Sequence, residues 1–91
     1  MVVSDGASFD MNGMPMGYAI TLNGAGSNGG GALKNSSSTA AGLSGLYASI
    51  TLASNTTIMS DAGGININLG GTKPINGSAY TLTLAGTSVA N

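Results

Sequence analysis

The sequence has little charge and few of the side chains that carry out chemistry. Its 91 residues include no Cys, no His and no Trp, and only 5% are charged. Catalysis by a nucleophile or by an acid and base needs an activated group, and the only acids are Asp5, Asp10 and Asp61. The only basic side chains are Lys34 and Lys73, with no Arg. We therefore expect no enzyme, no catalytic residues and no cofactor.

The same absences exclude several partners. A formal net charge of -1 provides no basic patch for nucleic acid or an anionic membrane. No run of about 20 apolar residues exists, so we expect no membrane insertion. Without Cys there are no thiolate metal sites, and no Gly-Gly-x-Gly-x-Asp calcium nonapeptide occurs, so we expect no metal site. Residues 61–64, Asp-Ala-Gly-Gly, are typical of a corner between two strands.

The first residues, Met-Val-Val-Ser-Asp, lack the basic and apolar regions of a signal peptide. We expect either that an export signal has been removed or that the chain is an excised segment.

Glycine and hydrophobic residues are abundant, with 16 Gly and 42% hydrophobic residues. The linker-like composition of residues 27–38 makes disorder one alternative. Against it, apolar residues alternate with Thr, Asn, Asp or Ser in short runs separated by Gly, which predicts strands with one buried face. The runs cover residues 8–12, 18–23, 32–34, 49–53, 64–69 and 80–84.

The strongest pattern is an internal repeat, in which a Tyr precedes an Ile/Leu-Thr-Leu triplet three times. The tyrosines are Tyr18, Tyr47 and Tyr80, and the triplets cover residues 20–22, 50–52 and 82–84, at intervals of 30 and 32 residues. A period of this size indicates a repeat architecture. We predict an all-β parallel β-helix (β-solenoid) of about three coils of roughly 30 residues, with residues 1–91 as a single segment.

In that arrangement the aliphatic residues of the triplets point inward and stack into two columns, and their threonines point outward and stack into one ladder. The inward set is Ile20, Leu22, Ile50, Leu52, Leu82 and Leu84, and the outward set is Thr21, Thr51 and Thr83. The alternative is an antiparallel sandwich or barrel, which the four Asn-Gly pairs would suit.

Two further clusters have structural interpretations. Residues 24–29 have the G-x-G-x-x-G spacing of a dinucleotide loop, but no helix pattern follows, so we predict a flexible loop. Met11, Met14 and Met16 surround Pro15. We expect Met11 in the core and Met14 or Met16 at a corner or covering an end.

Several segments together resemble the autotransporter-associated β-strand repeat regions of bacterial surface proteins. They are Phe-Asp-Met-Asn-Gly at residues 9–13, Ala-Ile-Thr-Leu-Asn-Gly at 19–24, and the segments 28–37, 49–58, 75–77 and 80–86. The resemblance implies a right-handed parallel β-helix that is exported and used as a stalk, adhesin or matrix fibre. It implies an extracellular or cell-surface location.

We therefore expect a structural extracellular protein, a subunit or segment of a surface fibre or adhesin stalk. Both ends of such a coil have unpaired strand edges without a polar cap, which predicts head-to-tail self-association into a filament. A host or matrix surface or a polysaccharide is a further expected partner. The alternative function is a module that binds polysaccharide or ice through an exposed Thr/Asn face. Sequons at Asn35, Asn55 and Asn76 fit N-glycosylation in an exported chain, or are chance triplets in a chain rich in Asn, Ser and Thr.

Overall fold

The computed structural model describes residues 1–45, 48–61, 63–69, 75–77 and 79–86. The all-β prediction is confirmed, because the described chain contains nine strands and a single turn of 3-10 helix, η1. In order, the elements are β1 (Val2–Val3), β2 (Phe9–Asp10), β3 (Pro15–Met16), β4 (Ala19–Gly24), η1 (Ser27–Gly29), β5 (Leu33–Asn35), β6 (Ala41–Gly45), β7 (Ser49–Ser60), β8 (Ile65–Leu69) and β9 (Leu82–Ala85).

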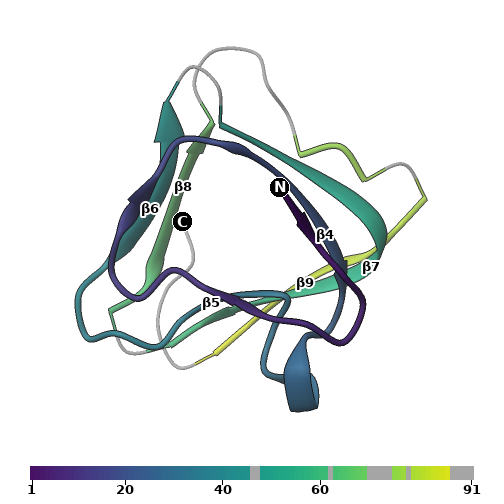
Figure 1. Ribbon diagram of the computed structural model, residues 1–91, viewed down its shortest axis with the longest axis horizontal. Helices are drawn as coiled ribbons and strands as arrows, with labels where there is room; N and C mark the ends of the chain where they lie inside the picture. Colours follow the sequence, from purple (N-terminus) through teal and green to yellow (C-terminus); the bar gives the residue numbers. More distant parts are fainter. Residues whose placement is uncertain (46–47, 62, 70–74, 78, 87–91) are drawn as a thin grey trace.

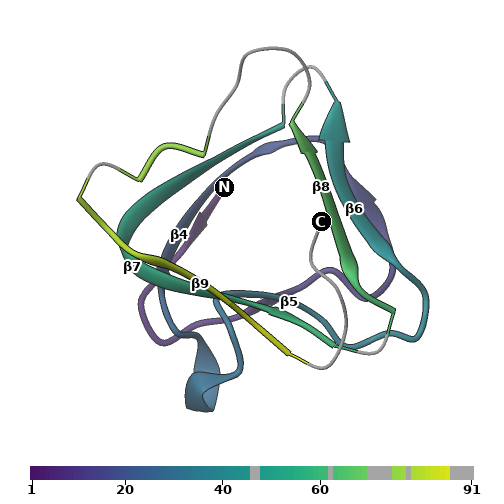
Figure 2. The same cartoon turned by 180° about the vertical axis from the view of Figure 1, so that it is seen from behind.

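All the strand pairs among these elements are parallel. One sheet has the order β1-β4-β7-β5-β2, with β9 also paired to β7, and a second sheet has the order β3-β6-β8. Seen down the shortest axis, the strands form three walls around a common interior (Figures 1 and 2). The antiparallel hairpins of the sandwich alternative are not found in the described part of the chain.

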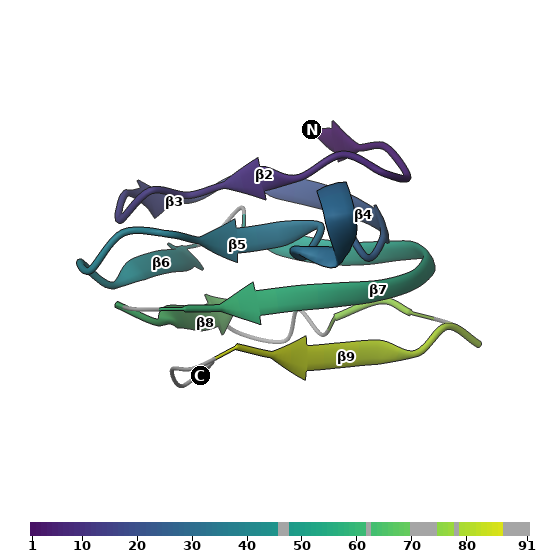
Figure 3. The ribbon, with the colours of Figure 1, turned by 90° about the horizontal axis from the view of Figure 1, so that it is seen from below.

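The strands lie in layers when the molecule is seen from the side (Figure 3). Each strand segment forms one layer of one wall, and we call such a layer a rung. The rungs β1, β2 and β3 lie at one end of the stack, and the rung β9 lies at the other. The molecule measures 30 × 29 × 19 Å, and its short dimension fits a few rungs separated by about 4.8 Å.

β7 is the longest strand, with 12 residues, and it belongs to two walls. Its first part pairs with β4, and its last part pairs with β5 and β9. The change occurs between Leu52 and Thr56, where the register with β4 shifts. Figure 1 shows β7 bending from one wall into the next at this point.

The predicted stacking of the triplets is confirmed for the first two copies. Ile20 lies opposite Ile50, and Leu22 lies opposite Leu52. For the third copy the prediction is wrong, because Leu82 lies opposite Thr56 and Leu84 lies opposite Ile58.

The cause lies in β7 itself, where residues 56–58 alternate buried and less buried positions as the triplet does, although the buried Thr56 is polar. Leu82-Thr83-Leu84 pairs with Thr56-Thr57-Ile58 in the second wall. The position below the second triplet is taken by residues 75–77, through a parallel bridge between Thr51 and Asn76. In the second wall the repeat is about 25 residues, since Phe9, Leu33, Ile58 and Leu84 form one column.

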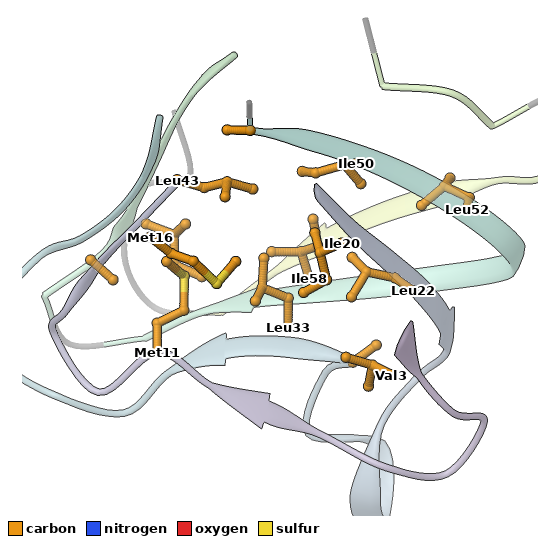
Figure 4. Close-up of a cluster of buried hydrophobic side chains, with 14 residues drawn as sticks. Val3, Met11, Met16, Ile20, Leu22, Leu33, Leu43, Ile50, Leu52 and Ile58 are labelled. Carbon is orange, nitrogen blue, oxygen red and sulfur yellow. The ribbon is translucent and has the colours of Figure 1, made fainter. Parts of the chain in front are cut away.

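The core consists of aliphatic and Met side chains that the three walls direct into the common interior (Figure 4). The buried residues are Val3, Met11, Met16, Ile20, Leu22, Ala32, Leu33, Ala41, Leu43, Ala48, Ile50, Leu52, Ile58 and Ile65. Full burial of one such Leu or Ile side chain stabilises the fold by about 1.5 to 3 kcal/mol. Of the six aliphatic residues predicted to point inward, Leu82 is half-buried and Leu84 is 55% exposed, because β9 has no further rung on its outer edge in the described chain.

Two glycines allow close approach between rungs. Gly31 has φ +97, and a Cβ there would lie 2.6 Å from the Cβ of Met59. Gly86 has φ +114, and a Cβ there would lie 2.3 Å from the carbonyl oxygen of Ser60. Any other residue at these positions would combine backbone strain with a clash.

Candidate functional site

The side chain of Asn35 is fully buried at a corner between two walls. Its Nδ2 donates to the carbonyl oxygens of Thr39 (2.9 Å) and Gly64 (2.8 Å). Its Oδ1 accepts from the amides of Gly13 (2.9 Å) and Ser37 (3.2 Å). All four of its hydrogen-bonding positions are therefore used, and the partners come from three successive layers. Asn35 therefore has a structural role at the corner, and the folded chain buries the side-chain amide that its sequon would offer for glycosylation.

Asp10 closes the same corner from outside. Its carboxylate accepts hydrogen bonds from the amides of Asn12 (3.0 Å) and Ser36 (3.1 Å) and from the Ser36 hydroxyl. The Ser36 hydroxyl above all, with both amides and the charge of Lys34, holds the pKa of Asp10 below its ordinary value of 3.8. These contacts stabilise a loop and leave the carboxylate without a catalytic partner among the described residues.

Among the described residues, the large exposed hydrophobic side chains lie near the two ends of the stack. We name as the leading end the surface formed by β1, β2, β3 and the loops between them, and as the trailing end the surface formed by β9 with residues 75–77. At the leading end and in the turn that follows β3, the exposed residues are Met1, Val2, Met14 and Tyr18. At the trailing end and in the turn before β9, they are Leu84 and Tyr80. Exposed apolar groups gathered in this way are typical of interaction surfaces.

The leading end has an apolar hollow of about 230 Å³. It is lined by Met1, Phe9, Met11, Met14, Pro15, Met16 and Tyr18. The prediction for Met11 is confirmed, since it is 4% exposed. Met14 is exposed at this end, as expected for one of the other two, whereas Met16 is buried in the core. The lining contains no charged side chain, so the hollow fits an apolar group.

Both ends also have strand edges without a partner in the described structure. β1 pairs only with β4, β2 only with β5, and β9 only with β7 among the named strands. An unpaired edge presents backbone N–H and C=O groups that can pair with another strand.

The outward threonines form shorter columns than predicted. Thr21 lies opposite Thr51 in the first wall, whereas Thr83 lies opposite Thr57 in the second wall. The expected ladder of Thr21, Thr51 and Thr83 is therefore wrong, for the same reason as the register of the third triplet.

The glycine-rich segment 24–29 forms a short turn at a corner. η1 occupies Ser27–Gly29, the amide of Gly31 donates to the carbonyl of Ala25 (2.7 Å), and the amide of Ser27 donates to the Ser8 hydroxyl (2.8 Å). A dinucleotide site needs the N-terminus of a full helix after the glycines, and here the helical turn has only three residues.

The remaining candidates lie on turns or outside the described residues. Asp61 follows β7 in a turn whose Gly64 amide donates to the Asp61 carbonyl (2.9 Å), as expected for a corner. The sequon residues Asn55 and Asn76 are exposed. Tyr47, Ala62, Lys73 and Ser78 lie outside the described residues.

Neither a metal cluster nor a membrane-spanning helix is found in the described ranges. No group of three or more acidic, His or Cys side chains there is close enough to hold a metal ion. No helix there has the length and apolar character needed to cross a bilayer.

The described structure thus defines an all-β protein of parallel strands, with a polar corner and two apolar ends. Comparison with protein families, with curated proteins and with solved structures gave no match.

Proposed function

We propose that the chain is a β-solenoid segment that serves as a structural unit of an extracellular fibre, built by stacking copies end to end. The observation that carries the proposal is the position of the exposed apolar side chains near the two ends of the stack, next to unpaired strand edges. A capped, monomeric repeat protein has polar end surfaces.

The side walls support a structural role in a different way. Their outward positions carry small or polar groups such as Thr21, Thr51 and Lys34, and the described residues include no group of three or more acidic, His or Cys side chains. The resemblance to surface-protein repeats favours export to the cell surface. A binding face for ice or polysaccharide has less support, because the stacked threonines are divided between two walls.

Light scattering and negative-stain electron microscopy of the purified protein test the proposal. We expect filaments at micromolar concentration, and fewer and shorter ones for Leu84→Lys, since a charge on the exposed edge strand opposes pairing. Thr51→Lys is the matched control, because Thr51 is also exposed but lies on a side wall. A stable, monodisperse monomer of 8.7 kDa would contradict the stacking function.

A further inference from the structure

We propose that the trailing end of one copy docks on the leading end of the next in the register that continues the internal columns, which makes the fibre polar. This inference rests on the proposed stacking function and specifies its contact residues. The partner is a second copy of this chain.

The first argument is the fit of one side chain to the hollow. In the column Phe9, Leu33, Ile58 and Leu84, the next rung after Leu84 would be Phe9 of the following copy. Leu84 is 55% exposed, and Phe9 lines the apolar hollow of about 230 Å³. An apolar cavity of about 150 Å³ accommodates a group the size of benzene, so the hollow has room for the Leu84 side chain.

The second argument concerns two corner columns that end in glycine. In the first column, Val3 lies opposite Leu22, and Leu22 lies opposite Leu52. Gly77 is the next member of this column, as shown by the distance of 3.1 Å between a Cβ built at Gly77 and Leu52 Cδ1. In the head-to-tail contact, Gly77 of one copy would lie next to Val3 of the following copy. Val3 is already buried at the leading end, so it needs no further side chain to cover it, and Gly77 has none.

The same relation holds at the Asn35 corner. The amide of Met11 donates to the carbonyl of Lys34, which places Met11 next to Asn35, and Asn35 pairs with Ser60. Gly86 lies beside Ser60, because the preceding residues Met59 and Ala85 pair with each other. Met11 is buried at the leading end, and Gly86 occupies the corresponding position at the trailing end. In a head-to-tail stack each glycine therefore meets an apolar side chain.

Strand direction gives the third argument. A two-fold contact between two leading ends would pair their strands antiparallel, whereas the pairs within the molecule are parallel. Head-to-tail docking keeps the strands parallel and repeats the internal contact. A contact between two different surfaces that does not close into a ring continues as an open filament.

Cysteine cross-linking tests the register, because the chain contains no Cys. Val2, Thr21, Thr51 and Asn76 share one outward column, so Asn76 of one copy would lie one rung from Val2 of the next. Adjacent rungs about 4.8 Å apart are within the Cα separation of a disulfide. We expect Val2→Cys and Asn76→Cys, mixed and oxidised, to give a disulfide dimer, and the double variant to give a ladder of multimers.

The control is Thr21→Cys mixed with Asn76→Cys, which places the thiols one rung further apart and should give no dimer. Dimers of Val2→Cys alone would contradict head-to-tail docking. Filaments without the cross-link would overturn the register and leave the proposed function standing, while monomers in light scattering would overturn both. Circular dichroism of each variant confirms that the fold is retained.

Discussion

The corner residue Asn35 gives the sharpest test of how the layers are held together. Asn35→Ala removes the acceptor of two backbone amides, those of Gly13 and Ser37, and the donor to two carbonyls, those of Thr39 and Gly64. Each bond contributes about 0.5 to 1.5 kcal/mol net, and more where the partner stays buried without water. We therefore expect a loss of about 3 to 5 kcal/mol in the free energy of unfolding, a large part of the total for a small domain.

Urea denaturation followed by circular dichroism measures this loss. Asn55→Ala is the matched control, because Asn55 is exposed and its Oδ1 accepts one hydrogen bond, from the amide of Thr81 (2.9 Å). We expect that variant to lose about 1 kcal/mol or less. Equal losses of unfolding free energy for the two variants would refute the argument that burial and four simultaneous hydrogen bonds make Asn35 more stabilising than an exposed Asn.

Three other perturbations follow from the structure. Leu22→Ala, at a fully buried position, should lower the free energy of unfolding by about 2 to 5 kcal/mol in the same titration, whereas Thr51→Ala should change it little. Because folding lowers the pKa of Asp10, its stabilising effect is complete above its ordinary value of 3.8 and is lost as the pH falls through the lower folded value, so melting curves of Asp10→Asn should depend less on acid than those of the unmodified protein. Gly31→Ala should lower the melting temperature, since the new Cβ would meet the neighbouring rung at a positive φ, and an unchanged melting curve would contradict that packing.

The sequence predicts the strands best where alternation and repetition agree. The triplets at residues 20–22 and 50–52 have the same residue types at the same phase, and they lie in register as expected. The third triplet shows the limit of this reasoning. It pairs with Thr56-Thr57-Ile58, whose first buried residue is polar, and not with Ile50-Thr51-Leu52, which it matches more closely. Sequence alone does not determine which segment a bending strand presents to it.

Other elements lack a local signal. β6 has the sequence Ala-Gly-Leu-Ser-Gly, which contains no β-branched residue, yet it lies between β3 and β8 with Leu43 buried. Hydrogen bonding to β3 and β8 on its two sides stabilises the extended conformation of this segment, so its strand conformation depends on its neighbours and not on its own residue types.

The role of Asn35 was predictable only in part. Asn and Gly are expected at the corners of a coil, but a sequon at the same position suggested an exposed acceptor. Burial decides between the two interpretations, and burial depends on Gly13 and Gly64, which are distant in sequence.

The path of β7 through two walls has a consequence for the lifetime of the fold. On the first wall its Leu52 amide donates to Asn76, and on the second wall its Thr56 amide donates to Thr81 while its Thr57 carbonyl accepts from Ala32. Rungs therefore cover β7 on both sides in both walls, and a local opening that frees its amides must detach neighbours in both. Amide hydrogen exchange is slowest where only global unfolding exposes the backbone. We therefore expect the slowest-exchanging amides of both walls to lie in β7, and the two walls to open together as one cooperative unit.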